Sequence, residues 1–352
     1  MPASPPTGGC THANDPPYMS KHSVLVVGCG SIGERHLRCF LKTGRAQVTA
    51  CEANATLLQR MADTYQVPVA SDWKTAINGN FDAIVICTPA PMHVPMATQA
   101  LAAGRHVLVE KPLSQSLEGV EELFRTRDRS GRQLAVAYVL HINAILTAAR
   151  AFLKRGEFGP VRQASVVSGQ SFHLFRPAYA QTYYRDRRTG GGAIQDALTH
   201  TVNWVESVIG PADSVLCDCA HLVLPGVEVE DTVHVSARHG AAMATYALNQ
   251  FQAPNETTIQ FHAAGGSVKI ELRQQRWGTY RARDTDWVWH DMPPVERDGP
   301  FLDQANAFLD QIEGQPSRLC SLEAAAQTLR FNLAALASAE SNSRVSCAAM
   351  KA

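Results

Sequence analysis

Residues 24–37 read VLVVGCGSIGERHL, four aliphatic residues followed by glycines in the pattern G-x-G-x-x-G. The aliphatic run is typical of a buried strand and the residues after the turn are typical of a helix, which is the setting in which such glycines bind a dinucleotide. Gly28 permits the tight turn, Gly30 lets the backbone approach a pyrophosphate, and Gly33 allows the helix to pack closely on the strand. This stretch therefore predicts a nucleotide-binding strand, turn and helix.

Two further features of this region bear on the choice of cofactor. Ser31 and Ile32 stand at the start of the predicted helix, where unpaired backbone N–H groups bind phosphate. Glu52 ends the next predicted strand, about 20 residues downstream, where an acidic side chain bonds the ribose hydroxyls. A carboxylate there repels the 2′-phosphate of NADP, and Ala53 and Asn54 provide no cation to receive it. The sequence predicts NAD as the cofactor, with NADP less favoured.

The rest of the chain falls into two patterns. Short aliphatic runs, such as 83–87 (AIVIC) and 106–109 (HVLV), alternate with helical stretches up to about residue 143, which is typical of a parallel sheet covered on both faces. Beyond it, strand-like runs follow one another with few helices between them, which favours a mostly antiparallel sheet. We expect an α/β chain in which an N-terminal Rossmann dinucleotide-binding domain precedes an α+β domain built on a mostly antiparallel open sheet. The predicted parts are a disordered tail (1–20), the dinucleotide-binding domain (21–143), a substrate-binding and oligomerisation domain (144–340) and a second tail (341–352).

Composition excludes several classes of function. The 32 Lys and Arg balance the 32 Asp and Glu, so neither a nucleic-acid partner nor an anionic membrane surface is expected. The apolar runs are shorter than the roughly 20 residues that cross a bilayer, and the first twenty residues lack the pattern of a signal peptide. Translation beginning at Met1 or at Met19 is equally compatible with this.

The nine cysteines contain no C-x-x-C pair, so neither a zinc site nor any other metal centre is predicted. Cys217 and Cys219 alone are close in sequence, and we expect them to point to opposite faces of a strand. Cys29, Cys39 and Cys51 lie in apolar segments, where a free thiol behaves as a small hydrophobe. Reduced cysteines favour a cytoplasmic location.

Residues 190–200 read GGGAIQDALTH and place an aspartate and a histidine at helical spacing after three glycines. One interpretation is an ordinary surface pair on a helix that begins after a flexible turn. The other is a catalytic pair, Asp196 and His200, with the glycines bringing backbone close to a cofactor or substrate. The pattern by itself leaves both open.

A third stretch, residues 87–114, contains Thr88-Pro89, then His93, then Glu110-Lys111-Pro112 after a predicted strand. Together with the two glycine-containing stretches it resembles the Gfo/Idh/MocA oxidoreductases, named after glucose–fructose oxidoreductase, inositol dehydrogenase and a rhizopine-catabolism protein. The resemblance extends from residue 23 to about residue 341. It implies that Thr88, Pro89, His93, Glu110 and Lys111 belong to the cofactor site, with a structural role as the alternative for His93.

The resemblance also implies that Lys111, Asp196 and His200 line the nicotinamide and the substrate. Oxidation of a secondary alcohol moves a hydride to the nicotinamide and releases a proton from oxygen. His200 is suited to accept the proton, because its ordinary pKa lies near working pH. Asp196 would orient the imidazole or hold a hydroxyl, and Lys111 would stabilise negative charge on the reacting oxygen.

Selectivity is expected to come from the loop 171–192, SFHLFRPAYAQTYYRDRRTGGG, just before the reacting helix. Arg176, Tyr184 and Arg185 in it, together with Tyr138, are the candidate substrate-binding residues. They suit a sugar, a sugar acid or a cyclitol. Leu198 stands where relatives commonly have glycine, so substrate identity does not transfer from a better-known member.

Three other functions remain open at this point. Some members of the family use NAD transiently to cleave glycosidic bonds by elimination, and others are non-catalytic, dinucleotide-binding regulatory proteins. The third is reduction of an imine or a double bond, which the same lysine could support. The retained Lys111, Asp196 and His200 favour a dehydrogenase acting on CH–OH groups. The resemblance further implies a homodimer or homotetramer formed through the open sheet.

Overall fold

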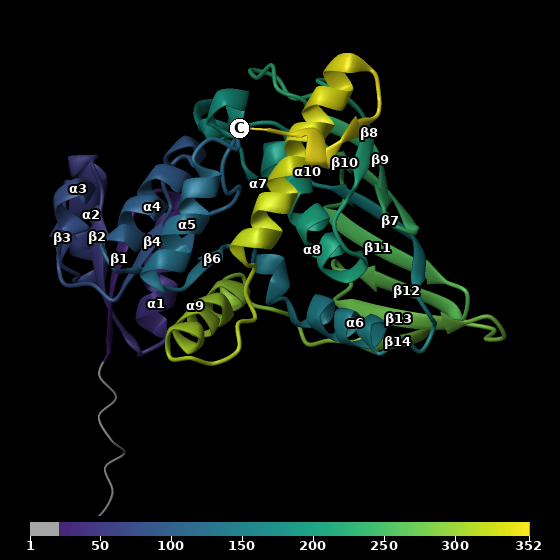
Figure 1. The fold of residues 1–352 in the computed structure, drawn as a ribbon, viewed down its shortest axis with the longest axis horizontal. Coiled ribbons are helices and arrows are strands. Elements are labelled where there is room, and N and C mark those ends of the chain that lie inside the picture. Colours follow the sequence, from purple (N-terminus) through teal and green to yellow (C-terminus); the bar gives the residue numbers. More distant parts are fainter. Residues whose placement is uncertain (1–20, 352) are drawn as a thin grey trace, which may run out of the picture.

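The computed structural model describes residues 21–351, so the predicted tail 1–20 and the choice between Met1 and Met19 lie outside the described residues. Two sheets of six and nine strands lie side by side, with helices packed between and around them (Figure 1). The predicted α/β class and the two kinds of sheet are both confirmed. No helix among residues 21–351 combines the length and the apolar character that crossing a membrane requires.

The N-terminal sheet is entirely parallel, with the strand order β3-β2-β1-β4-β5-β6. This is the order of a doubly wound Rossmann fold, in which ligands bind beyond the carboxyl ends of the strands. The aliphatic run 24–27 is β1 and is buried on both sides. Its elements are β1 (His22–Val27), α1 (Ser31–Lys42), β2 (Ala46–Cys51), α2 (Ala55–Tyr65), β3 (Val69–Ala70), α3 (Trp73–Ala76), β4 (Ala83–Ile86), α4 (His93–Ala102), β5 (His106–Val109), α5 (Val120–Ser130) and β6 (Leu134–Val136).

The C-terminal sheet has the order β14-β13-β12-β11-β7-β10-β9-β8-β15, and its strands are antiparallel except where β7 and β10 run parallel. Alternate residues of each strand are buried under helices α6, α8 and α10, which leaves the other face open. Its strands are β7 (Val161–Gly169), β8 (Ser214–Ala220), β9 (Thr232–His239), β10 (Ala242–Asn249), β11 (Glu256–Ala263), β12 (Gly266–Glu271), β13 (Arg276–Arg281), β14 (Val288–Asp291) and β15 (Val345–Ser346). The helices of this half are α6 (Ala144–Lys154), α7 (Phe172–Phe175), α8 (Thr199–Ile209), α9 (Gly299–Ile312) and α10 (Leu322–Ser341).

The two C-terminal helices tie the domains together. Phe308 of α9 lies in one core with Phe40 of α1, so α9 completes the Rossmann domain. The first half of α10 packs into the N-terminal core through Leu329, and its second half packs into the C-terminal core through Phe331. The predicted boundary at residue 143 therefore separates the two sheets but assigns α9 and half of α10 to the wrong core.

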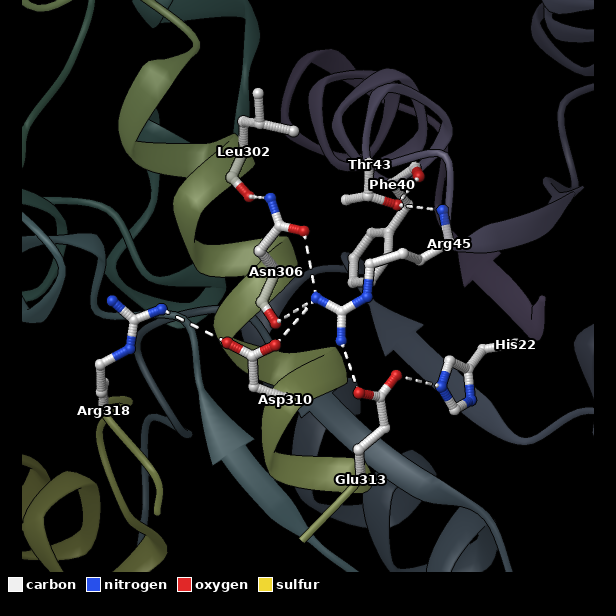
Figure 2. A network of polar contacts seen from close by, with 9 residues as sticks. All are labelled: His22, Phe40, Thr43, Arg45, Leu302, Asn306, Asp310, Glu313 and Arg318. Atoms are coloured by element: carbon white, nitrogen blue, oxygen red, sulfur yellow. Dashed lines mark hydrogen bonds and ion pairs between the residues drawn. The ribbon is translucent and has the colours of Figure 1, made fainter. Parts of the chain in front are cut away.

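A cluster of charged side chains fastens the end of α9 to the first two strands (Figure 2). Arg45, just before β2, donates from Nη1 to Asp310 Oδ1 at 2.8 Å, and its Nη2 lies 2.9 Å from Glu313 Oε2. His22 Nε2 lies 3.0 Å from the other oxygen of Glu313. His22 and Arg45 hold the pKa of Glu313 below its usual value, so the carboxylate stays ionised. The cluster sits at the amino ends of the strands, away from the nucleotide edge.

Two sequence expectations about the second half are wrong, and two of its strands were not foreseen. The predicted tail is not one over residues 341–351, because β15 pairs with β8 and Cys347 is buried in the C-terminal core. Strands β13 and β14 were not predicted, because Gly278 and the turn between them break the aliphatic pattern. Cys217 and Cys219 lie on the same face of β8, as residues two apart on a strand must.

Candidate active site

Four strands of the Rossmann sheet end at one edge, and each is followed by a predicted site residue. Gly28 follows β1, Glu52 follows β2, Thr88 lies just beyond β4, and Lys111 lies just beyond β5. Because parallel strands present their carboxyl ends together, residues far apart in sequence are gathered at one place.

Packing explains two of the three glycines in the β1–α1 turn. Gly28 has a φ of 85°, and a Cβ on it would lie 2.9 Å from the carbonyl carbon of Cys87. A Cβ on Gly33 would lie 1.7 Å from the carbonyl oxygen of Gly28, so only glycine lets α1 approach β1. A Cβ on Gly30, in contrast, would meet no atom within 4 Å. Gly30 therefore faces open space at the helix start, where a phosphate can approach.

Glu52 is held at the rim of this turn. Its Oε2 accepts from the backbone N–H of Cys29 at 2.8 Å, and its Oε1 accepts from the backbone N–H of Asn54 at 2.9 Å. No side chain caps the N-terminus of α1, so the first N–H groups of the helix, including those of Ser31 and Ile32, are available to an anion. The open side of Gly30, the uncapped helix and the fixed carboxylate fit NAD.

Lys111, Asp196, Arg176 and Tyr183 form the reacting cluster. Lys111 Nζ donates to the backbone oxygen of Asp196 at 2.9 Å and to its Oδ1 at 3.1 Å. Arg176 Nη1 donates to Asp196 Oδ2 at 2.8 Å, and the Tyr183 hydroxyl donates to Oδ1 at 2.7 Å. Asp196, 1% exposed, lies in the π-helical segment Ile194–Leu198 that leads into α8, a geometry often found at functional sites. The structure thus joins Lys111 to Asp196 across the two domains.

Electrostatics fix the charges of the two groups at the start of α8. Burial opposes ionisation of Asp196, but the charges of Lys111 and Arg176 and the Tyr183 hydrogen bond outweigh it, so its pKa lies well below the usual value. Burial and the charge of Lys111 lower the pKa of His200 to about 3. His200 is therefore neutral at ordinary pH, and in the described chain no hydrogen bond joins it to Asp196.

Glu110 supports Lys111 from behind. Its buried carboxylate binds His36 Nε2 at 2.7 Å through Oε1 and accepts from the backbone N–H of Lys111 at 3.0 Å through Oε2. Burial works against its ionisation, but the hydrogen bond from His36 and the charge of Lys111 lower its pKa overall. Glu110 was predicted to bind the cofactor; its carboxylate instead faces the protein and orients the backbone of Lys111.

His93 is also structural in this chain. Both of its ring nitrogens lie on backbone carbonyls, Nδ1 at 2.8 Å from Pro112 and Nε2 at 2.7 Å from Thr88, and the ring is buried. It was predicted among the cofactor residues, but no polar ring atom is left for a ligand. His93 links the loop after β4, where Thr88 and the exposed Pro89 adjoin the glycine turn, to the Lys111–Pro112 corner.

In the loop 171–192 the structure places Tyr183, and not the predicted Tyr184, against Asp196. Tyr184 is 1% exposed, packs against Phe172 and Tyr179, and places its hydroxyl on the Gln250 side chain. Its exposed neighbour Tyr183 contacts Asp196 instead. Adjacent residues of the 3-10 turn Tyr183–Arg185 point in different directions. A Tyr-Tyr pair in a loop has no periodicity that would tell which tyrosine is buried and which contacts Asp196.

The other two candidate substrate residues also lie away from the cluster. Arg185 is exposed, and no ion pair of the described chain includes it. Tyr138 is buried, with its hydroxyl 2.8 Å from Thr199 Oγ1 and its ring edge-on to His200 at 5.9 Å. Tyr138 therefore supports the helix that carries His200, and of the four predicted substrate residues only Arg176 reaches the cluster.

The glycines at 190–192 make room for protein atoms. A Cβ on Gly191 would lie 2.1 Å from the carbonyl oxygen of Tyr184, and a Cβ on Gly192 would lie 2.4 Å from Glu230 Oε1. Glu230, which sequence reasoning missed, accepts from the N–H of Ile194 at 3.1 Å and so fixes the start of the helix. These glycines were expected to bring backbone close to a ligand, but the structure gives Gly191 and Gly192 a packing role instead. Nothing in the run VEVED around Glu230 indicated that this carboxylate would contact the helix start.

Comparison with known proteins agrees with this geometry. Residues 22–138 match the family described as "Oxidoreductase family, NAD-binding Rossmann fold", and residues 146–269 match the "GFO/IDH/MocA C-terminal domain". An uncharacterised oxidoreductase of Bacillus subtilis is 24% identical over 285 residues, covering 78% of this chain and 81% of that protein. An inositol 2-dehydrogenase/D-chiro-inositol 3-dehydrogenase of Shouchella clausii is 33% identical over 116 residues, or 32% of this chain and 34% of that protein.

Solved structures share the fold at lower identity. Levoglucosan dehydrogenase, in complex with NADH and levoglucosan, has a TM-score of 0.83 at 19% identity and is covered over its full length by 93% of this chain. An NAD-binding oxidoreductase from Klebsiella pneumoniae has a TM-score of 0.84 at 18% identity, with 93% of this chain and 99% of that chain covered. The two family matches together span most of residues 22–269. The chain belongs to the Gfo/Idh/MocA family and is an NAD-dependent oxidoreductase.

Proposed function

We propose that this oxidoreductase oxidises a secondary alcohol of a sugar, a sugar acid or a cyclitol, with Lys111, Asp196 and His200 as its acid–base set. The observation that carries the proposal is the placement of Lys111, whose ammonium is held by Asp196 beside the edge where β1, β4 and β5 end. The named substrates of two similar proteins, an inositol and levoglucosan, support the class of compound.

Lys111 is the donor to the reacting oxygen. An ammonium has three N–H groups, and Asp196 accepts two of them, so one is left for the alcohol oxygen. This fixed positive charge favours loss of the alcohol proton because it stabilises the negative charge that develops on oxygen. NAD supplies the hydride acceptor when it is bound.

His200 and Asp196 have different roles in this scheme. His200 is neutral, so one ring nitrogen keeps a lone pair that can receive the proton. Its pKa of about 3 corrects the sequence expectation of a value near working pH and makes the imidazole a weak base, so the proposed proton transfer depends on Lys111 stabilising the alkoxide. Both carboxylate oxygens of Asp196 accept hydrogen bonds, Oδ1 from Lys111 and Tyr183 and Oδ2 from Arg176, and the carboxylate stays ionised. It orients Lys111 and does not itself transfer a proton.

The test is NADH formation by the purified protein with NAD and a panel of cyclitols, aldoses and sugar acids, with His200→Asn assayed in parallel. We expect turnover by the wild type and a loss of about 100-fold or more in the variant, the range typical of a missing acid–base group. Tight NAD binding without NADH from any compound would contradict the proposal. The elimination-type glycosidase and the regulatory protein would then be the better candidates.

We further propose a homodimer or homotetramer formed through the open face of the nine-stranded sheet. Val167, Leu216 and Met243 are exposed on this face, opposite the side covered by the helices. Sedimentation velocity should show an oligomer that Met243→Arg dissociates; a monomeric wild type would contradict this.

The free thiols of all eight described cysteines support a cytoplasmic location, and recovery of the native protein from an oxidising compartment would oppose it.

A further inference from the structure

The two cations of the reacting cluster are not equally compensated. The buried carboxylates of Asp196 and Glu110 both act on Lys111. Arg176, in contrast, pairs only with Asp196 in the described chain and shares that carboxylate with Lys111. Lys111 and Asp196 are almost enclosed by the protein, with side-chain exposures of 12% and 1%. The charge of Arg176 is therefore the less compensated of the two.

Arg176 is the cation that can offer its charge to a ligand. It follows α7, its guanidinium lies over the ring of Phe172 at 5.1 Å, and Nη1 is fixed by Asp196. Its side chain is nonetheless 46% exposed, and Asp196 is its only acidic partner in the described chain. A guanidinium has five N–H donors in a planar fork, so donors remain for a second oxyanion after Asp196 is satisfied.

We propose that the substrate carries a carboxylate and that Arg176 binds it while Lys111 holds the alcohol to be oxidised. This rests on the proposed function of the same site and narrows its substrate from sugars and cyclitols in general to polyhydroxy acids. Arg176 and Lys111 contact opposite oxygens of Asp196, so a single molecule the size of a sugar acid reaches both. A guanidinium is matched in shape and charge to a carboxylate, whereas a neutral polyol offers Arg176 no opposite charge.

The test compares matched substrates that differ only at the acidic group. D-glucuronate is paired with D-glucose and D-galacturonate with D-galactose, each assayed with NAD and wild type, Arg176→Gln or Arg188→Gln. Arg188 is the control because it lies in the same loop, is 89% exposed and pairs with Asp186 outside the cluster. Both variants therefore lose one positive charge from the loop.

We expect the wild type to prefer the acid of each pair in kcat/KM. Arg176→Gln should reduce that preference about 100-fold, the loss typical of a missing charge-assisted contact, and Arg188→Gln should leave it unchanged. A wild type that prefers the neutral member, or an Arg176→Gln loss that is equal for both members, would overturn the inference while leaving the dehydrogenase intact.

Binding measured without turnover separates this inference from the proposed function. Calorimetric titration of the NADH-bound protein with each acid and its neutral partner needs no reaction. If no compound is oxidised but wild type binds the acids and Arg176→Gln does not, the carboxylate site stands and the proposed reaction fails. If neither acid binds more tightly than its neutral partner, the carboxylate site is refuted.

Discussion

Replacement of Lys111 with methionine is expected to lower kcat/KM about a thousandfold, because the variant keeps the aliphatic stem but loses the donor to the reacting oxygen. NAD should still bind, since the glycine turn and Glu52 lie on other strands. Steady-state kinetics and NAD titration measure the two effects separately. Lys74→Met, on the exposed side of α3, is the control and should change neither. Near-normal turnover by Lys111→Met would show that another group stabilises the oxygen.

The same variant should change the protonation of two neighbours. The ammonium of Lys111 lowers the pKa of both Asp196 and His200, so both values should rise when it is removed. In the wild type His200 gains a proton only near pH 3, whereas in the unfolded chain it does so near its ordinary value of about 6.5. The unfolded state therefore binds more protons between those values, and stability falls as pH falls through that window. NMR titration of the His200 ring should show a higher pKa in Lys111→Met.

Gly33→Ala is expected to destabilise the N-terminal domain by about 3 kcal/mol or more, because the added methyl would lie 1.7 Å from the carbonyl oxygen of Gly28. That oxygen belongs to the backbone and cannot turn aside, so α1 must move away from β1. The helix start that receives the phosphates then moves with it, and NAD affinity should fall about 100-fold even where the chain folds. Chemical denaturation and NAD titration measure the two losses.

Gly30→Ala separates the two consequences. Its methyl meets no protein atom within 4 Å, so denaturation should be close to that of the wild type. It occupies the side from which the pyrophosphate is expected to approach, so NAD should bind more weakly. Unchanged NAD affinity in Gly30→Ala would mean that the phosphates lie elsewhere on the turn.

The strands and the glycine turn could be predicted from the sequence because each leaves a local pattern, whereas the roles of Lys111, Asp196 and His200 were implied by the family resemblance and stay a prediction. The run before Gly28 is continuously aliphatic since β1 is buried on both faces, and Glu110-Lys111 follows a run of the same kind in β5. The spacing of Asp196 and His200 predicted a helix, which the structure has. The π-helical segment, however, directs Asp196 toward Lys111 and not toward His200.

The surroundings of the site were out of reach because they depend on contacts distant in sequence. A small core with Phe172 buries Tyr184 and leaves Tyr183 to contact Asp196. The side chain of Glu230 lies where a Cβ of residue 192 would be, so this position requires glycine. His93 and Glu110 were assigned to the cofactor from the resemblance, but their partners, backbone carbonyls and His36, could not be read from spacing.

Helix α10 connects the hydrophobic cores of the two domains (Figure 1). Leu329 and Phe331, two residues apart, belong to the cores of different domains. Unfolding of either core would therefore expose the apolar side chains of one half of α10. The two sheets are thus not interchangeable modules: a relative's substrate domain grafted onto this Rossmann domain would have to bring a matching half-helix with it.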